Sequence, residues 1–220
     1  MNKNNNKRER ILDAMQELMR TASAQAISVS DIAQKAGIGK GSIYYYFPSK
    51  NNIIDAVIER SYSRVLDAGR ELAASSHMDA FKKMEIIYNA CLDSSTELRR
   101  QEAIGTFNEQ QESAFIHQKF ARIIITKLKP ILTDIIRQGM DEGSIQCQYP
   151  EETAQIVLTV LTITLDNHLV PAGPEQIGRV LTAFTQMQEK SMGMPADTLQ
   201  FLMRKNEAEA ARPMKETDNR

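Results

Sequence analysis

Apolar residues recur every three or four positions along most of the chain, which is the spacing that places them on one face of an α-helix. The first such stripe predicts a helix over residues 7–22, whose apolar positions are Ile11, Leu12, Met15, Leu18, Met19 and Ala22. Residues 1–6 are polar and are expected to be disordered unless an anionic partner is near. No segment shows the alternation typical of a strand, so the sequence predicts an all-α fold.

Two short helices joined by a tight turn are predicted between residues 28 and 50. Ser28 can accept a hydrogen bond from an amide of the first turn, and Asp31 stands where the acidic partner of a capping box belongs. The first short helix therefore begins near Val29. Gly37 follows its apolar face, and glycine can adopt the left-handed backbone that ends a helix without a Cβ penalty.

The second short helix begins near Gly39 or Lys40, turns Ile43 and Phe47 inward, and is stopped by a proline. It carries three consecutive tyrosines, Tyr44–Tyr46, whose side chains point about 100° apart and so cannot all be buried. A helix, a glycine turn and a second helix with a basic start and hydrogen-bonding aromatics form the layout of a helix-turn-helix. Such a motif inserts its second helix into the major groove of DNA.

The rest of the chain predicts longer helices followed by a polar tail. One helix runs over residues 50–72 and can act as a rigid connection about 30 Å long. The other predicted helices are a stripe over 81–92, a short helix around Ile104 and Phe107, a long helix over 115–140 with a kink or break at Pro130, two helices over 151–169 and 175–192, and a short one around Leu199–Met203. The tail over 206–220 is poor in apolar residues and is expected to be disordered.

The predicted helix over 151–169 is apolar on two neighbouring faces. One face holds Ala154, Val157, Leu158, Leu161 and Leu165, and the other holds Ile156, Val160 and Ile163. A helix that is apolar on two sides needs partners on two sides. This helix and its successor over 175–192 are therefore predicted to form a homodimer surface, in which two copies build a four-helix bundle. The alternative is that both faces fill the core of one protomer.

Charge is distributed unevenly, although the net charge is only −1. Residues 1–60 hold nine Lys and Arg against six Asp and Glu, whereas the rest holds 18 against 22. The local excess of positive charge coincides with the predicted helix-turn-helix. Attraction to phosphate is therefore expected at that module and not over the whole surface.

Other classes of protein find little support. No apolar run has membrane-spanning length, and the polar start lacks the apolar core of a signal peptide, so a cytoplasmic protein with no membrane partner is expected. Cys91 and Cys147 are expected to be reduced thiols. His77, His117 and His168 show no metal-binding spacing, and no catalytic arrangement of Ser or Cys with His is apparent. We therefore expect no metal, no cofactor and no enzymatic activity.

The run IAQKAGIGKGSIYYYFPSKNNI, preceded by RERILDAMQELM, resembles the DNA-binding domain of the TetR/AcrR family of transcriptional regulators. The distinctive Tyr-x-x-Phe-x-x-Lys ending of that domain stands here as Tyr44, Phe47 and Lys50. The resemblance is close near the start of the chain and elsewhere extends only to the helical layout. It implies a helix-turn-helix domain over 1–49 and a helical ligand-binding and dimerisation domain over 50–205.

Carried over position by position, the resemblance implies that the start of the recognition helix and its tyrosines contact DNA. It also implies that Lys50 binds a phosphate at the start of the next helix. The full implied set is Ser28, Ser30, Lys40, Gly41, Ser42, Tyr44, Tyr45, Tyr46 and Lys50. Gly39 departs from the family pattern, which usually has Ser or Thr at this cap and so offers a hydroxyl to DNA.

The resemblance further implies a small-molecule effector, apolar or amphipathic, in the larger domain. The residues implied to face it are Tyr62, Tyr88, Phe107, Phe115, His117 and Phe120. The implied function is a repressor that binds a near-palindromic operator in double-stranded DNA as a dimer and is released by the effector. Two other functions stay open: a DNA-binding co-regulator or architectural protein without an effector, and an enzyme with an accessory DNA-binding module.

Overall fold

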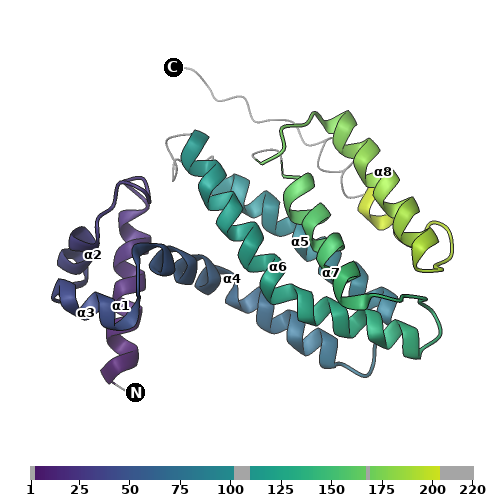
Figure 1. Cartoon of the computed structure of the whole chain (residues 1–220), viewed down its shortest axis with the longest axis horizontal. Coiled ribbons are helices and arrows are strands. Elements are labelled where there is room, and N and C mark those ends of the chain that lie inside the picture. The colour runs from purple at the N-terminus through teal and green to yellow at the C-terminus, as the bar shows by residue number, and fades with distance from the viewer. Residues whose placement is uncertain (1–2, 102–109, 167–168, 204–220) are drawn as a thin grey trace. The chain divides into compact units, whose positions relative to one another are not determined.

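The computed structural model describes residues 3–101, 110–166 and 169–203, and these residues form helices joined by turns (Figure 1). No strand occurs in these ranges, which confirms the all-α prediction. The helices are α1 (Lys3–Leu18), α2 (Val29–Ala36), α3 (Lys40–Tyr46), α4 (Lys50–Ala74), α5 (Ala80–Gln101), α6 (Gln110–Asp141), α7 (Pro150–Thr159) with a π-helical turn η2 (Val160–Thr164), and α8 (Pro174–Ser191). No described helix has the length and apolar composition needed to cross a bilayer.

The chain forms two compact units. The first comprises Met1–Ala68 and Asp93–Lys127, and the second comprises Gly69–Leu92 and Leu128–Arg220. Helices α4, α5 and α6 each begin in one unit and end in the other. The division into 1–49, 50–205 and 206–220 stays a prediction, and its tail, like the short helix predicted around Ile104 and Phe107, lies outside the described residues.

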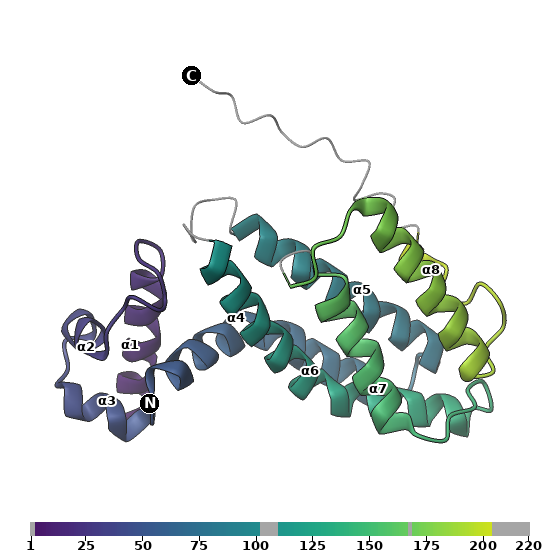
Figure 2. The same ribbon diagram turned by 45° about the horizontal axis from the view of Figure 1, so that its top comes forward.

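Helices α1, α2 and α3 pack together in the first unit, as both ribbon views show (Figures 1 and 2). Their shared core is apolar, because Ile11, Ile32 and Ile43 are each at most 1% exposed. Two cations of α1 add contacts at the edge of this core. The guanidinium of Arg8 lies 5.3 Å from the ring centroid of Phe47, and Nη2 of Arg10 donates to the carbonyl oxygens of Ala36 and Gly37.

Local backbone signals set both ends of α2 as predicted. The hydroxyl of Ser28 accepts from the amide of Asp31 at 3.1 Å, and the Asp31 carboxylate accepts from the amide of Ser28 at 2.8 Å. The hydrogen bond from the Ser28 amide, followed by one from the Ser28 side chain, holds the pKa of the Asp31 carboxyl below its ordinary value. Gly37 ends α2 in the left-handed region with φ 63°, where a Cβ would also lie 3.0 Å from Nη2 of Arg10. Glycine therefore fits this turn both by conformation and by space.

Helix α1 begins and ends four residues earlier than predicted, at Lys3 and Leu18. The polar start contains no helix breaker and needs no buried face, so the helix extends through it, and the predicted disorder of residues 1–6 is wrong from Lys3 onward. At the other end, the amides of Arg20 and Thr21 donate hydrogen bonds to the carbonyl oxygens three residues earlier and not four. The small polar residues that follow cannot sustain the helix.

Helix α6 runs unbroken through Pro130. A proline removes one backbone hydrogen bond, and the neighbouring Leu128, Ile131 and Leu132 are buried, so packing holds the helix on both sides of the missing bond. The break is therefore excluded, and the predicted kink stays a prediction.

The helix predicted over 151–169 is shorter in the structure. It changes to a π-helical turn at Val160, where the amide of Leu165 donates to the Val160 carbonyl five residues earlier, and it ends at Thr164. Thr162 is buried and its hydroxyl donates to the carbonyl of Leu158. This hydroxyl competes with the backbone amides for the Leu158 carbonyl, which weakens α-helical winding in this turn.

A buried cation lies where α5 meets the end of α4 in the second unit. Lys83 is 1% exposed, and its ammonium donates to the carbonyls of Ala73 and Ser75 and to the amide oxygen of Gln138. All three of its donors are thus used, and its positive charge faces the carbonyl end of a helix, where it is stabilising.

Candidate nucleic-acid interface

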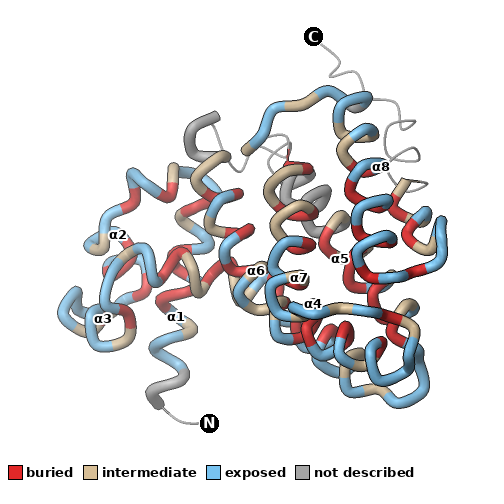
Figure 3. Tube along the Cα trace, turned by 45° about the vertical axis from the view of Figure 1, so that its right-hand side comes forward, coloured by how far each residue is buried: buried red, intermediate tan, exposed pale blue. Residues whose placement is uncertain are grey.

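The tyrosines of α3 lie on the surface while the opposite side of the helix is buried. Tyr45 is 76% exposed and Tyr44 is 50% exposed, whereas Ile43 and Phe47 are 1% and 4% exposed. Tyr46 is half-buried, and its ring meets the ring of Tyr45 edge to face at 5.0 Å between centroids. The burial trace shows the same alternation along α3 (Figure 3). A helix of this kind can present hydroxyl donors to a groove while its inner side holds the module together.

The start of α3 is open. Lys40 and Gly41 are exposed, and a Cβ added at Gly39 or Gly41 would meet no atom within 4 Å. Gly39 caps the helix without any side-chain hydrogen bond. The backbone here is therefore accessible to a close partner, with the Lys40 ammonium beside it to attract phosphate.

The serines at the start of α2 are exposed as well. The hydroxyl oxygen of Ser28 is occupied as an acceptor by the capping box, which leaves its hydrogen able to donate. Ser30 has no such role in the cap. Both serines can thus donate to a phosphate, although the capping carboxylate of Asp31 lies close to Ser28 and opposes an anion there.

Lys50 has a structural role that sequence reasoning missed. Its ammonium donates to the carbonyls of Gln25 at 2.6 Å and Ile27 at 2.9 Å, which ties the loop before α2 to the first residue of α4. An ammonium has three donors, so one is left for another acceptor. The contact between Lys50 and phosphate stays a prediction, and it now rests on that third donor.

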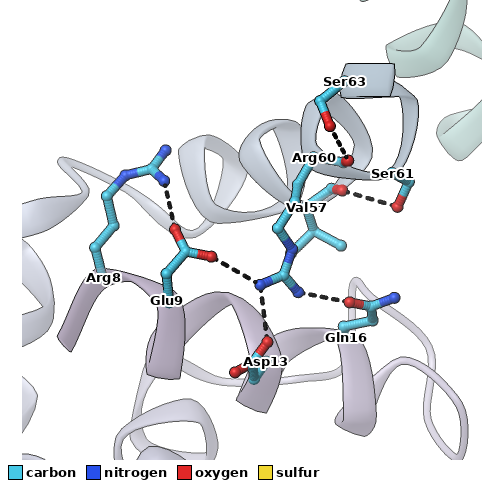
Figure 4. Close-up of polar contacts among 8 residues, drawn as sticks. All are labelled: Arg8, Glu9, Asp13, Gln16, Val57, Arg60, Ser61 and Ser63. Atoms are coloured by element: carbon cyan, nitrogen blue, oxygen red, sulfur yellow. Dashed lines mark hydrogen bonds and ion pairs between the residues drawn. The ribbon is translucent and has the colours of Figure 1, made fainter. Parts of the chain in front are cut away.

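A second missed residue, Arg60, joins α4 to α1 (Figure 4). Its Nη1 lies 3.1 Å from the carboxylate of Glu9 and 2.8 Å from that of Asp13, and its Nη2 donates to the amide oxygen of Gln16 at 2.5 Å. The three partners are spaced three or four residues apart and so line one face of α1. One guanidinium thereby connects α4 to α1.

Helix α4 also carries acidic side chains that pair with α6 in the same unit. Asp55 lies 2.8 Å from the ammonium of Lys119 and 2.6 Å from the guanidinium of Arg122, and Glu59 lies 2.8 Å from the ammonium of Lys127. From the sequence alone, these charged residues are interpreted as a helix face exposed to solvent. Their partners lie more than 60 residues away, so no local pattern could have found them.

Replacing Arg60 with Met should lower the free energy of unfolding by about 1 kcal/mol. The partly exposed ion pairs of Arg60 contribute modestly, and their loss leaves Asp13 without this cation while Glu9 keeps its contact with Arg8. Urea unfolding of the variant measures this. Arg179→Met is the matched control, since Arg179 pairs with Glu175 one turn earlier on the exposed face of α8. Equal losses in the two variants, or no loss at Arg60, would contradict the structural role of Arg60.

The residues implied to face an effector fall in both units. Tyr62 and Phe120 are buried in the first unit with ring centroids 4.7 Å apart, and His117 is buried there too. Phe115 is half-buried, with the ammonium of Lys119 5.1 Å from its ring centroid. Tyr88 is buried in the second unit, and Phe107 lies outside the described residues. Among the described residues, no group of three His, Cys, Asp or Glu could hold a metal ion.

Both helices predicted to form the dimer surface expose apolar side chains. Ile156 on α7 is 57% exposed, and Met187 on α8 is 70% exposed. A shallow hollow runs along α7, lined by Glu152, Gln155, Ile156, Thr159 and Val160. Helix α8 is buried along one side and exposed along the other (Figure 3). A contiguous apolar patch can mark a site of association, whereas single exposed apolar side chains are ordinary, so the dimer surface stays a prediction.

Comparison with protein families gives two matches, one near the start of the chain and one over its later helices. Residues 11–57 match the family described as "Bacterial regulatory proteins, tetR family", and residues 99–187 match "Tetracyclin repressor-like, C-terminal domain". The first range contains α2 and α3 in full. The helix-turn-helix that the sequence predicted is therefore the part of the chain that the first family describes.

Individual proteins give the same result. The HTH-type transcriptional repressor KstR2 of Rhodococcus jostii is 23% identical over 153 residues, which cover 67% of this chain and 72% of the relative. The uncharacterised HTH-type transcriptional regulator YvdT of Bacillus subtilis is 41% identical over 61 residues, which cover only 28% of this chain and 31% of the relative. The crystal structure of RolR without ligand shares the fold, with a TM-score of 0.55 at 15% identity over 94% of this chain and 97% of that one.

Proposed function

This chain belongs to the tetR family of bacterial transcriptional regulators, and on that premise we propose that it represses transcription as a homodimer on a near-palindromic operator. A small apolar or amphipathic effector releases the dimer from the operator. The protein acts in the cytoplasm, where the chromosome is accessible to it. The observation that carries the proposal is the exposure of Tyr44 and Tyr45 on a helix whose other side is buried.

The proposed contacts divide into those that hold the DNA backbone and those that approach the bases. Hydroxyl and ammonium donors to phosphate fix the position and orientation of the protein on the duplex without reading sequence. Residues at the open start of α3 approach the base edges. The proposed DNA-binding residues are Ser28, Ser30, Lys40, Gly41, Ser42, Tyr44, Tyr45, Tyr46 and Lys50.

The proposed dimer forms through α7 with η2 and α8. The exposure of Ile156 and Met187 supports this choice, because a twofold axis would bring each apolar face against its own copy. Two recognition helices in successive major grooves of one duplex face are spaced about 34–36 Å apart. A dimer of that geometry explains why the operator is expected to be a near-palindrome.

We propose that the effector releases the dimer from the operator by changing the position of α4. This helix starts at Lys50, which is tied to the DNA-binding module, and it continues into the second unit as far as Ala74. An effector that favours one position of α4 changes the spacing of the two recognition helices. Allosteric coupling of this kind is typically about 1–3 kcal/mol, or roughly 5- to 150-fold in affinity.

Selection of genomic fragments by the purified protein, followed by footprinting, tests the proposed function. The expected result is enrichment of a few fragments, each with two protected half-sites about one helical turn apart on one face of the duplex. Protection of single unpaired half-sites would exclude the dimer, and uniform recovery of all fragments would exclude a sequence-specific repressor. Genes beside the recovered sites then suggest candidate effectors, which must weaken operator binding by the same factor by which the operator weakens theirs.

A further inference from the structure

Tyr88 on α5 is fully buried in the second unit, and among the described residues its hydroxyl has no hydrogen-bond partner. Leaving a buried polar group unpaired costs about 1–3 kcal/mol, so proteins seldom keep one where an apolar residue of the same shape would serve. Phenylalanine would fill the same space without that cost. The hydroxyl therefore requires an explanation other than packing.

The surroundings of Tyr88 are apolar and uncharged. The ring of Phe201 lies 6.3 Å from the Tyr88 ring between centroids, and Met84 and Cys91, one turn before and after Tyr88 on α5, are at most 1% exposed. Burial raises the pKa of the Cys91 thiol to about 12, and it raises the pKa of the Tyr88 phenol far above its ordinary value. Both groups keep their protons, so Tyr88 can act as a neutral donor.

Lys83 and Glu189 are two of the charged side chains buried in the second unit, and both have hydrogen-bond partners. The Lys83 ammonium on α5 uses its three donors on α4 and α6, as described above. The Glu189 carboxylate on α8 accepts from the amides of Asp197 at 3.2 Å and Leu199 at 2.8 Å. Neither residue could therefore neutralise a charged ligand beside Tyr88, and burying an unpaired charge is costly. An uncharged ligand avoids that desolvation cost.

The segment over residues 194–203 borders Tyr88 through Phe201, which is only half-buried. Glu189 holds this segment to α8 by the two hydrogen bonds just described. Asp197 within it has φ 65°, a left-handed conformation that is uncommon for a residue other than glycine. Leu199 and Leu202 are at most 1% exposed and anchor this segment in the core, so Phe201 between them is the partly exposed part of the wall around Tyr88.

We propose that the Tyr88 hydroxyl donates a hydrogen bond to the effector, and that the effector is an uncharged apolar compound with a carbonyl or similar acceptor, bound between α5 and the segment over 194–203. This proposal rests on the effector-controlled function proposed above and names the chemical class of the effector. Binding would pair a hydroxyl that is otherwise unsatisfied, so the hydrogen bond contributes more to affinity than it would at an exposed site.

Acetophenone and ethylbenzene are suitable probes, because they match in shape and differ chiefly in that acetophenone carries a carbonyl oxygen. Calorimetric titration of the full-length protein should show acetophenone binding tighter than ethylbenzene by about 2- to 10-fold. Tyr88→Phe should abolish that difference and should melt no earlier than the unmodified protein. Tyr149→Phe, at a tyrosine that is 60% exposed, is the matched control and should keep the difference.

Three results would overturn the proposal: equal affinity for the two probes, no binding of either probe, or a Tyr88→Phe variant that melts earlier and so shows a structural partner for the hydroxyl. Operator binding by the same variant keeps this test separate from that of the proposed function. Because Tyr88 lies outside the DNA-binding residues, Tyr88→Phe should footprint like the unmodified protein. A failure of footprinting in the unmodified protein would instead count against the proposed function.

Discussion

Replacing Ile156 with Asp should convert the proposed dimer to a monomer and lower operator affinity by at least ~100-fold. Ile156 is 57% exposed on α7, and a twofold interface there would bring the new carboxylate into an apolar, dehydrated contact. Without the partner, the second recognition helix is no longer held near its half-site, and the gain from linking two binding modules is lost. Analytical ultracentrifugation and operator titration measure the two effects.

Ile86→Asp is the matched control, because Ile86 is also a partly exposed isoleucine, 38% exposed on α5, but lies outside the proposed interface. It should leave both assembly and operator affinity unchanged. Met187→Glu on α8 should reproduce the Ile156→Asp result, since both helices belong to the same surface. An Ile156→Asp protein that remains dimeric and binds the operator normally would refute the interface.

Removing the hydroxyl of Tyr45 should weaken operator binding on the order of 100-fold. A hydrogen bond to a charged group contributes about 1.5 kcal/mol or more, and a dimer carries two copies. Tyr45 is 76% exposed, so Tyr45→Phe leaves the fold and its stability unchanged. Fluorescence anisotropy with the selected operator gives the affinity, and the same titration at several salt concentrations shows what kind of contact is lost.

The salt series distinguishes the DNA contact of Tyr45 from that of Lys40. A neutral hydroxyl releases no counterion, so Tyr45→Phe should leave the slope of log K against log salt as it is. Lys40→Gln should reduce the slope by up to about 2 for the dimer, since each phosphate neutralised contributes about 0.9. Tyr149→Phe serves as the control away from α3. An unchanged affinity for Tyr45→Phe would remove this tyrosine from the interface, whatever the slope.

The parts of the fold that local chemistry determines were predictable. Ser28 and Asp31 cap α2, Gly37 ends it, and the burial of Ile43 and Phe47 follows from their spacing on α3. Each of these features depends on residues within a few positions of one another, which is the range that a sequence pattern can report.

Features that depend on distant partners were not predictable. The partners of Lys50 and Arg60 lie 23 to 51 positions away, and nothing near either residue distinguishes it from an ordinary surface cation. The π-helical turn at Val160 was not predictable either, because the spacing of apolar residues does not distinguish π-helical from α-helical winding. The family resemblance likewise implied that Tyr62 and Tyr88 face an effector, without indicating that they belong to different units.

Helix α4 is bound on one side by its acids to α6 and on the other by its arginine to α1, and the side chains involved remain partly open to solvent. Dissolved ions therefore weaken both the attraction between the protein and DNA phosphates and the ion pairs that join α4 to α1 and α6. A salt titration reports their sum. Variants of this regulator should accordingly be compared at matched ionic strength, where the internal ion pairs are the same in every variant that keeps Arg60, Asp55 and Glu59 and so cancel.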